Sequence, residues 1–373
     1  MKIGVDARQL SRPLTGMGRY TLEICQALSK TEGVSLYLYS PAPLHFTFPG
    51  LERAQVRTKN WNSGVLRQLW TETFLPAWVS RDDLDIFWGP AHRIPRFLPP
   101  KIARVITIHD LAWKYAGDTM PALRRKLEQI QIPTAIRNSD WVVTDAFSTA
   151  RDLKQEYPDS KNKTSVIHLG ATQHSETLPF KNLESMGITK NYFLFVGTLE
   201  PRKNLFRLLD SYAQLSESVK NQAHFVIVGG KGWCGVNIDK TVCDLDLEPY
   251  VHVLGYVDNI KLASLYKHAL FLTMPSLYEG FGLPLAEAMA HGTPVLTSNN
   301  SSMPEVAGKA GLLVDPLSVA SIRDGLQRLI LDHNFRTLLA SRAKSSAKQF
   351  DWDITASRLM DVFNKAIELR RKK

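Results

Sequence analysis

The chain has 373 residues, a length that suits two domains better than one ordinary core. Its three scattered cysteines (Cys25, Cys234 and Cys243) form no CxxC pair and accompany no histidine cluster, which argues against a disulfide framework or a structural zinc site. The formal net charge of +10 favours an anionic partner, but no nucleic-acid-binding motif accompanies it, so we expect no nucleic acid among the partners.

Short apolar runs rich in β-branched residues alternate with helical periodicity along the whole chain, which is typical of βαβ units around parallel sheets. A first series begins with a strand at 2–7 and a helix that starts near Arg19. Its further strands are expected at 35–40, 85–90, 103–110, 141–147 and 164–170. The first half of the chain is therefore predicted to form an α/β domain.

A polar segment at 171–189, broken by Pro179, has little periodicity and is typical of a linker to a second series. The strands of this series are expected at 192–198, 224–230, 251–257, 271–276 and 293–298, and its helices at 204–215, 261–269 and 284–292. The terminal stretch 350–373 is amphipathic and predicts a last helix.

The segment SLYEGFGLPLAEAMAHG contains two glutamates, Glu279 and Glu287, with seven residues between them. It leads from a predicted strand into a helix, where open α/β sheets bind their ligands. Gly280 and Gly282 let the backbone approach a ligand, so amides and the helix N-terminus can face phosphate. Both carboxylates can then accept hydrogen bonds from sugar or ribose hydroxyls. The alternative is that neither glutamate binds a ligand. Glu279 would then be an ordinary loop carboxylate, and Glu287 a first-turn residue that the helix dipole favours.

This segment closely resembles the EX7E signature of the family-4 retaining glycosyltransferases, which have the GT-B fold. Further segments resemble the family in the same order and together span nearly the whole chain. They are TGMGRY at Thr15–Tyr20, ITIHD at Ile106–Asp110, VGTLEPRKN at Val196–Asn204, LGYVD at Leu254–Asp258 and SSMPEVAG at Ser301–Gly308.

The resemblance implies an α/β fold of two Rossmann-like domains whose parallel sheets face a central cleft. It also implies a C-terminal helix that crosses back to the N-terminal domain. Residues 1–172, with the returning helix at 352–373, would form the acceptor-binding domain. Residues 173–351 would form the domain that binds the nucleotide-sugar donor.

By the same resemblance, Glu279 contacts the transferred sugar and Glu287 the nucleotide ribose. Arg202 and Lys203 supply cations, which stabilise the charge that develops on the departing diphosphate. The backbone amides expected near the diphosphate and sugar are those of Gly280, Phe281, Gly282 and Leu283.

The other donor-binding residues that the resemblance implies are Gly16, Gly18, Gly197, Thr198, Tyr256 and Val257. Many family members have arginine where this chain has Thr198. Arg202 is the candidate to supply the positive charge of that arginine. Gly16 and Gly18 are expected in a turn between the first strand and its helix, where glycine is common for conformational reasons alone.

His109 lies at the carboxyl end of the strand 103–110, and the resemblance places it near the donor sugar as a catalytic residue. The alternative is a buried structural histidine bonded to the backbone. Arg19 and Asp110 are the candidates for acceptor binding. Asp110 also suits a role in shaping its loop or capping the segment that follows.

Family-4 members retain the anomeric configuration, yet the resemblance assigns no carboxylate nucleophile. We therefore expect front-face transfer, in which the departing phosphate accepts the proton of the acceptor hydroxyl. The DxD strings at Asp244–Asp246 and Asp351–Asp353 lie outside the predicted cleft loops, and Asp351 or Asp353 can cap the last helix. No metal and no cofactor are expected.

The expected function is transfer of a hexose, mannose from GDP-mannose, to a lipid-linked or polysaccharide acceptor in bacterial surface-glycan synthesis (O-antigen, capsule or exopolysaccharide). A UDP- or dTDP-sugar donor is one alternative. A sugar-nucleotide epimerase, a phosphorylase of the same fold and a noncatalytic scaffold subunit are the others.

The N-terminal sequence has no apolar leader, and the apolar runs are of strand length, so we expect a cytoplasmic protein. The basic segment at 123–137 follows the aromatic residues Trp113 and Tyr115. This mixture suits peripheral contact with the anionic inner face of the cytoplasmic membrane. An ordinary solvated helix face is the alternative.

Overall fold

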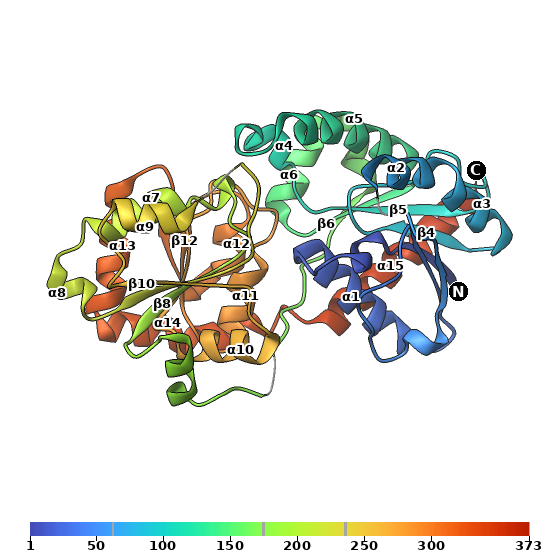
Figure 1. Cartoon of the computed structure of the whole chain (residues 1–373). Coiled ribbons are helices and arrows are strands. Elements are labelled where there is room, and N and C mark those ends of the chain that lie inside the picture. Colours follow the sequence, from blue (N-terminus) through green and yellow to red (C-terminus); the bar gives the residue numbers. More distant parts are fainter. Residues whose placement is uncertain (62, 174–175, 235–236, 373) are drawn as a thin grey trace. The chain divides into compact units, whose positions relative to one another are not determined.

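A computed structural model describes residues 1–61, 63–173, 176–234 and 237–372, which form two compact units (Figure 1). The first unit comprises Met1–Leu111, Lys126–Gly170 and Asp351–Lys373. The second comprises Ala112–Arg125 and Ala171–Phe350. The expected boundaries lie within two residues of the observed ones, but the assignment of Ala112–Arg125 to the second unit was not expected from the sequence.

The described residues of the first unit form a parallel sheet of seven strands in the order β3-β2-β1-β4-β5-β6-β7. The strands are β1 Lys2–Asp6, β2 Ser35–Ser40, β3 Gln55–Thr58, β4 Ile86–Gly89, β5 Ala103–Ile108, β6 Trp141–Thr144 and β7 Thr164–Val166. Residues of the central strands are buried on both faces, as expected for a sheet covered by helices on each side.

Helices cover both faces of this sheet, with α1 and α15 on one face and α5 and α6 on the other (Figure 1). The helices are α1 Gly16–Ser29, α2 Gly64–Glu72, α3 Phe74–Arg81, α5 Ala122–Asn138, α6 Phe147–Glu156 and α15 Trp352–Arg371. The 3-10 turns are η1 Arg8–Ser11, η2 Leu51–Arg53 and η4 Pro158–Lys163. The last helix α15 packs on α1 and β5, so the end of the chain completes the first unit.

The start of α1 differs from the sequence-based expectation. The amide of Arg19 donates to the carbonyl of Thr15 over 2.9 Å, which places Gly16 at the first helical position. Gly16 and Gly18 therefore lie in the first helical turn rather than in a turn before it. The segment between β1 and α1 is instead partly a 3-10 turn, Arg8–Ser11.

The second unit contains a parallel sheet in the order β10-β9-β8-β11-β12-β13. Its strands are β8 Tyr192–Val196, β9 His224–Val228, β10 Val251–Gly255, β11 Leu272–Met274, β12 Val295–Ser298 and β13 Gly311–Val314. In its core, the ring of Phe193 stacks on Phe225 and Phe271 at centroid distances of 4.6 and 5.2 Å. Such aromatic contacts add to the stabilisation from buried apolar area.

Helices also flank this second sheet, α7 and α13 being in contact with each other and α11 with α14 (Figure 1). The α-helices are α4 Ala112–Tyr115, α7 Leu205–Ala213, α8 Glu217–Lys220, α9 Ile238–Asp244, α10 Asn259–His268, α11 Leu283–Ala290, α12 Met303–Ala307, α13 Val319–Leu331 and α14 His333–Ala347. The 3-10 turns are η3 Gly117–Thr119, η5 Phe180–Met186, η6 Pro201–Lys203 and η7 Gly308–Ala310.

The expected linker at 171–189 belongs to the second unit and contains η5. Leu183 is fully buried there, and the amide of Leu178 donates to the hydroxyl of Ser264 over 2.7 Å. Residues 174–175 of this segment lie outside the described part. No helix that the structure describes combines the length and the apolar character needed to cross a bilayer.

Candidate active site

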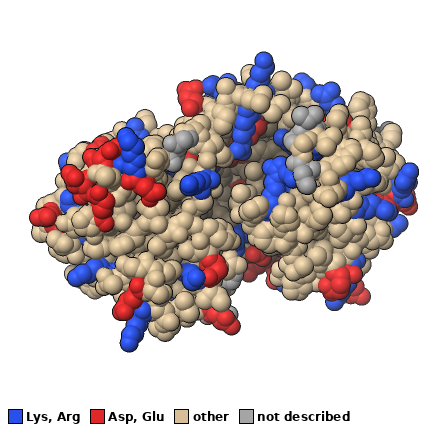
Figure 2. Space-filling model, in the orientation of Figure 1, with Lys and Arg blue, Asp and Glu red and all other residues tan. Residues whose placement is uncertain are grey.

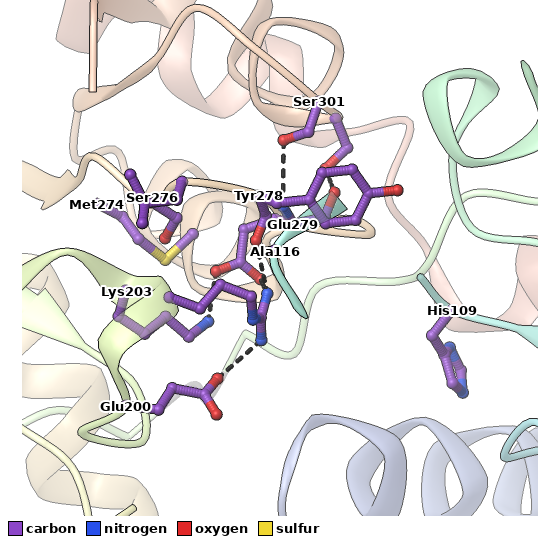
Figure 3. Close-up of polar contacts among 12 residues, drawn as sticks. His109, Ala116, Glu200, Lys203, Met274, Ser276, Tyr278, Glu279 and Ser301 are labelled. Atoms are coloured by element: carbon purple, nitrogen blue, oxygen red, sulfur yellow. Dashed lines mark hydrogen bonds and ion pairs between the residues drawn. The ribbon is translucent and has the colours of Figure 1, made fainter. Parts of the chain in front are cut away.

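The central feature of the second unit is Glu279, which forms ion pairs with the basic side chains of Arg202 and Lys203 (Figure 3). Its Oε1 accepts from the ammonium of Lys203 and its Oε2 from the guanidinium of Arg202, both over 2.7 Å. Arg202 and Lys203 form the turn η6 after β8, whereas Glu279 lies between β11 and α11. Because carboxyl ends of parallel strands share one edge of a sheet, these two loops meet there.

The three charges are nearly enclosed, with side-chain exposures of 7% for Glu279, 12% for Arg202 and 11% for Lys203. Burial alone would raise the pKa of Glu279, but the charges of Arg202 and Lys203 outweigh it and lower that pKa. Glu279 is therefore a carboxylate at neutral pH. It serves as an acceptor of hydrogen bonds, not as a proton donor.

The backbone around Glu279 is held from several sides. Its amide donates to the hydroxyl of Ser301 over 3.1 Å, and its carbonyl accepts from the hydroxyl of Ser302 over 3.0 Å. The carbonyl of Tyr278 accepts from Arg202 over 2.7 Å. Figure 3 shows Ser301 and Tyr278 beside Glu279, which is thus fixed through both backbone and side chain.

Glu200 also belongs to this cluster, although it was not among the predicted site residues. Its Oε1 accepts from Arg202 over 2.8 Å, and its side chain is only 3% exposed. Its Oε2 is buried and has no hydrogen-bond partner among the described residues. Arg202 therefore lies between two carboxylates, Glu200 and Glu279. The spacing of Glu200 two positions before Arg202 was the one signal in the sequence for this contact.

Glu287 lies inside α11, and its carboxylate accepts from the hydroxyl of Tyr266 on α10 over 2.9 Å. The helix begins at Leu283 after Gly282, which has a φ of +94°. This conformation favours glycine, whereas the nearest atom that a Cβ would meet is the Cε of Met303, the end of a flexible side chain. The two glutamates thus differ in their contacts. Glu279 accepts from two charged side chains, whereas Glu287 accepts from the hydroxyl of a tyrosine.

The remaining donor-binding candidates of the second unit lie at one edge of its sheet. Gly197 and Thr198 follow β8, Tyr256 and Val257 follow β10, and the loop Gly280–Leu283 precedes α11. Tyr256 is 75% exposed, so its ring is accessible. The structure therefore brings these predicted residues to the edge where parallel α/β sheets bind ligands.

His109 follows β5 in the first unit and has partners on both ring nitrogens. Nδ1 lies 2.6 Å from Oδ2 of Asp145, and Nε2 lies 2.7 Å from the carbonyl oxygen of Pro90. Burial opposes the charged ring, but the carboxylate of Asp145 and the Pro90 carbonyl outweigh it and raise the pKa of His109. These are the contacts of a buried histidine bonded to the backbone, and its catalytic role stays a prediction.

The other first-unit candidates lie near two strand ends. Gly16, Gly18 and Arg19 form the first turn of α1, and Asp110 follows His109 directly. Gly18 is buried, whereas Arg19 and Asp110 are half-buried. Their roles in binding stay predictions as well.

One of the two DxD strings, Asp351–Asp353, has a structural role. Asp351 caps α15, because its Oδ1 accepts from the amides of Asp353 and Ile354 over 2.8 and 3.0 Å. This confirms the capping interpretation for Asp351. The expectation that the protein needs no metal stays a prediction.

Comparisons with known proteins agree with this architecture. Residues 14–172 match the family described as Glycosyltransferase Family 4, and residues 174–346 match Glycosyl transferases group 1. The chain is 28% identical over 386 residues to O-antigen chain mannosyltransferase B of Escherichia coli, covering 97% of this chain and 99% of that protein.

A second relative is O-antigen chain mannosyltransferase RfbU of Salmonella typhimurium, which is 26% identical over 84% of this chain and 86% of its own length. Among solved structures, sucrose-phosphate synthase from Thermosynechococcus elongatus superposes with a TM-score of 0.77 at 19% identity, covering 98% of each chain. At that identity the likeness concerns the fold. With both halves matched and two parallel-sheet units present, the chain belongs to the family-4 glycosyltransferases of GT-B fold.

Proposed function

We propose that this glycosyltransferase moves mannose from GDP-mannose to a lipid-linked or polysaccharide acceptor, with retention of anomeric configuration, in the synthesis of a bacterial surface glycan such as O-antigen. The observation that carries the proposal is the binding of Glu279 by Arg202 and Lys203 at the carboxyl edge of the second sheet. The names of the two mannosyltransferase relatives support the choice of sugar.

The cluster suits a donor that carries both hydroxyls and phosphate. A carboxylate accepts hydrogen bonds from sugar hydroxyls, while guanidinium and ammonium groups bind phosphate oxygens. Arg202 and Lys203 can bind Glu279 and a phosphate at the same time, since each has several N–H donors and Glu279 uses only part of them. Negative charge grows on the diphosphate as it departs, and fixed cations stabilise that charge in the transition state.

The proposed step needs no carboxylate nucleophile. The bond between the anomeric carbon and the phosphate oxygen breaks, and its electron pair stays on the phosphate. The acceptor oxygen bonds to the same face of the anomeric carbon and gives its proton to that phosphate oxygen. Glu279 is engaged through both oxygens with Arg202 and Lys203, which suits a positioning and electrostatic role better than attack on carbon.

We further propose that helix α5 contacts an anionic membrane surface, where a lipid-linked acceptor would be present. Leu123, Leu127 and Ile130 are 72, 42 and 53% exposed and share one helix face at spacings of four and three residues. Three consecutive basic residues, Arg124–Lys126, lie beside this face. Figure 2 shows several acidic side chains gathered on the second unit, while basic side chains are spread over both units.

The donor is tested by thermal stabilisation of the purified protein with a panel of GDP-, UDP- and dTDP-sugars, because a ligand of the native state raises the unfolding temperature. GDP-mannose should give the largest shift and a transferred mannose in a coupled acceptor assay. A larger shift with a UDP- or dTDP-sugar would replace the proposed donor. No shift with any nucleotide sugar would overturn the proposal.

Membrane contact is tested by flotation with vesicles of phosphatidylcholine alone or mixed with phosphatidylglycerol. The protein should float only with the anionic vesicles, and less so as salt rises. Leu127→Glu should abolish flotation, with Leu338→Glu on the exposed face of α14 as the matched control. Equal flotation of wild type and Leu127→Glu would contradict this part of the proposal.

A further inference from the structure

The segment Ala112–Arg125 is unusual because it packs with the second unit, although the chain on either side of it belongs to the first. We call this segment the strap. It contains α4, η3 and the first residues of α5, and three of its apolar side chains, Trp113, Ala116 and Met120, are at least nine-tenths buried. The strap is therefore a packed element of the second unit and not a loose connection.

The strap contacts the loop 275–282 between β11 and α11, which contains Glu279 and is called the Glu279 loop below. The contact is an aromatic stack. The rings of Tyr115 and Tyr278 lie nearly parallel, with centroids 5.4 Å apart and an angle of 14° between the planes. Tyr278 is 6% exposed, and it directly precedes Glu279. The Tyr278 carbonyl also accepts a hydrogen bond from Arg202. The ring of Tyr115 thus packs on a residue whose backbone binds the same cation as the Glu279 carboxylate.

A second contact anchors the other end of the strap. The indole Nε1 of Trp233 donates to the carbonyl of Thr119 over 3.0 Å, and the guanidinium of Arg124 lies 4.5 Å from the centre of the Trp233 ring. Cation–π pairs of this kind stabilise a partly exposed contact. With one anchor at Tyr115 and another at Thr119 and Arg124, the strap has a defined position on the second unit.

We propose that the strap holds the Glu279 loop in its transfer-competent position and that Tyr115 is a positioning residue acting through Tyr278. This inference rests on the proposed function, since it assigns Tyr115 a role in the step that Glu279 serves. The ring of Tyr115 stacks on the ring of Tyr278, the residue before the carboxylate. Its ring limits the movement of the Tyr278–Glu279 peptide, and small displacements of positioning groups cost large factors in rate.

The test compares Tyr115→Ala and Tyr115→Phe in donor binding and in transfer. Tyr115→Ala should lower kcat by about tenfold while the donor KM changes less than about threefold, because the phosphate-binding cations remain. Tyr115→Phe keeps the stacking ring and should restore wild-type kcat. Trp233→Phe, which loses the hydrogen bond to Thr119, should lower kcat in the same direction with a smaller effect.

The matched control is Tyr250→Ala, which removes a half-buried tyrosine directly before β10, on the side of the sheet where its parallel strands begin. It should leave kcat unchanged even where it lowers the unfolding temperature. A double-mutant cycle supplies the second readout: Tyr115→Ala and Glu279→Gln should be less than additive in kcat, because both act through one carboxylate.

The outcomes separate this inference from the proposed function. If wild type binds no nucleotide sugar, the proposed function fails. If wild type transfers and Tyr115→Ala keeps its kcat, or if Tyr115→Phe is as impaired as Tyr115→Ala, the strap inference fails alone. Full additivity with Glu279→Gln would also overturn it.

Discussion

The ammonium of Lys203 lies 2.7 Å from Oε1 of Glu279, although 76 positions separate them in the chain. Through this contact, each of the two buried charges is balanced by a charge of opposite sign. Since the pKa of Glu279 is lowered, the stabilisation by its charge is present above its ordinary value and is lost only as the pH falls through the lowered one. Glu279 and its two cations should therefore be treated as one unit.

Removing Glu279 should damage both transfer and stability. Glu279→Ala leaves Arg202 and Lys203 buried without this counter-charge, and we expect the unfolding free energy to fall by about 3 kcal/mol. Transfer should fall by at least about a hundredfold, since the sugar loses its acceptor of hydrogen bonds. Denaturant unfolding and turnover at saturating donor measure the two effects. Exposed Glu217→Gln is the control, and wild-type turnover in Glu279→Ala would contradict the assignment.

Glu287 should affect the nucleotide more than the chemistry. Glu287→Ala should weaken binding of the nucleoside diphosphate by about tenfold, a typical value for a lost hydrogen bond to a charged group. The kcat at saturating donor should change little. Titration calorimetry with the diphosphate measures the affinity. Tyr266→Phe removes the observed partner but keeps the carboxylate, so its affinity should stay near wild type; a loss equal to that of Glu287→Ala would indicate a purely structural role.

His109 should be protonated at pH 6, because both ring nitrogens lie against acceptors and its pKa is raised. Its folded pKa is raised, so the resulting stabilisation is fully present below the ordinary value of about 6.5 and is lost as the pH rises through the folded value. Nitrogen chemical shifts in NMR report the ring state directly. Asp145→Asn should bring the titration back toward the ordinary value. A neutral His109 ring at pH 6 in the wild type would refute this prediction.

Transfer should be insensitive to chelators. Arg202 and Lys203 already supply positive charge to the proposed phosphate site. We expect the same rate with and without excess EDTA, measured after prior dialysis against the chelator. Loss of activity that added Mg²⁺ or Mn²⁺ restores would show that the two side chains do not suffice.

Asp351 should stabilise the first unit through the start of α15. Asp351→Ala removes two hydrogen bonds to backbone amides and should lower the unfolding free energy by about 1 kcal/mol. Asp353→Ala is the neighbouring control, since the Asp353 carboxylate makes an exposed ion pair with Lys30 at 3.5 Å instead of a cap. Thermal unfolding of both variants measures the difference, and equal stability would show that the cap contributes nothing.

The sequence predicted most of the strands because buried parallel strands are nearly continuous apolar runs. Two edge strands were missed, β3 Gln55–Thr58 and β13 Gly311–Val314. The strand β3 is largely exposed and polar in composition, and β13 is only partly buried. The start of α1 was placed too late because the glycines were taken as turn residues. Pairing with β2 defines the strand β3, and the hydrogen bond from the Arg19 amide to the Thr15 carbonyl defines the start of α1. Neither contact is visible in the local composition of the sequence.

The site was predictable in its residues more than in its contacts. The spacing placed Glu279 in a loop and Glu287 in a helix, as the structure shows. The ion pairs of Glu279 with Arg202 and Lys203 depend on two strands that lie side by side in the sheet and far apart in the chain. The stack of Tyr115 on Tyr278 depends on the strap, which no periodicity indicates.

The return of α15 to the first unit has a consequence for biosynthesis. The chain passes from one unit to the other at Leu111, Arg125, Gly170 and Phe350, so the first unit gains its last helix only after all of the second has been translated. The second unit is therefore synthesised completely before the last helix of the first unit. Until α15 emerges, the surfaces of α1 and β5 that it covers are open to solvent and to chaperones.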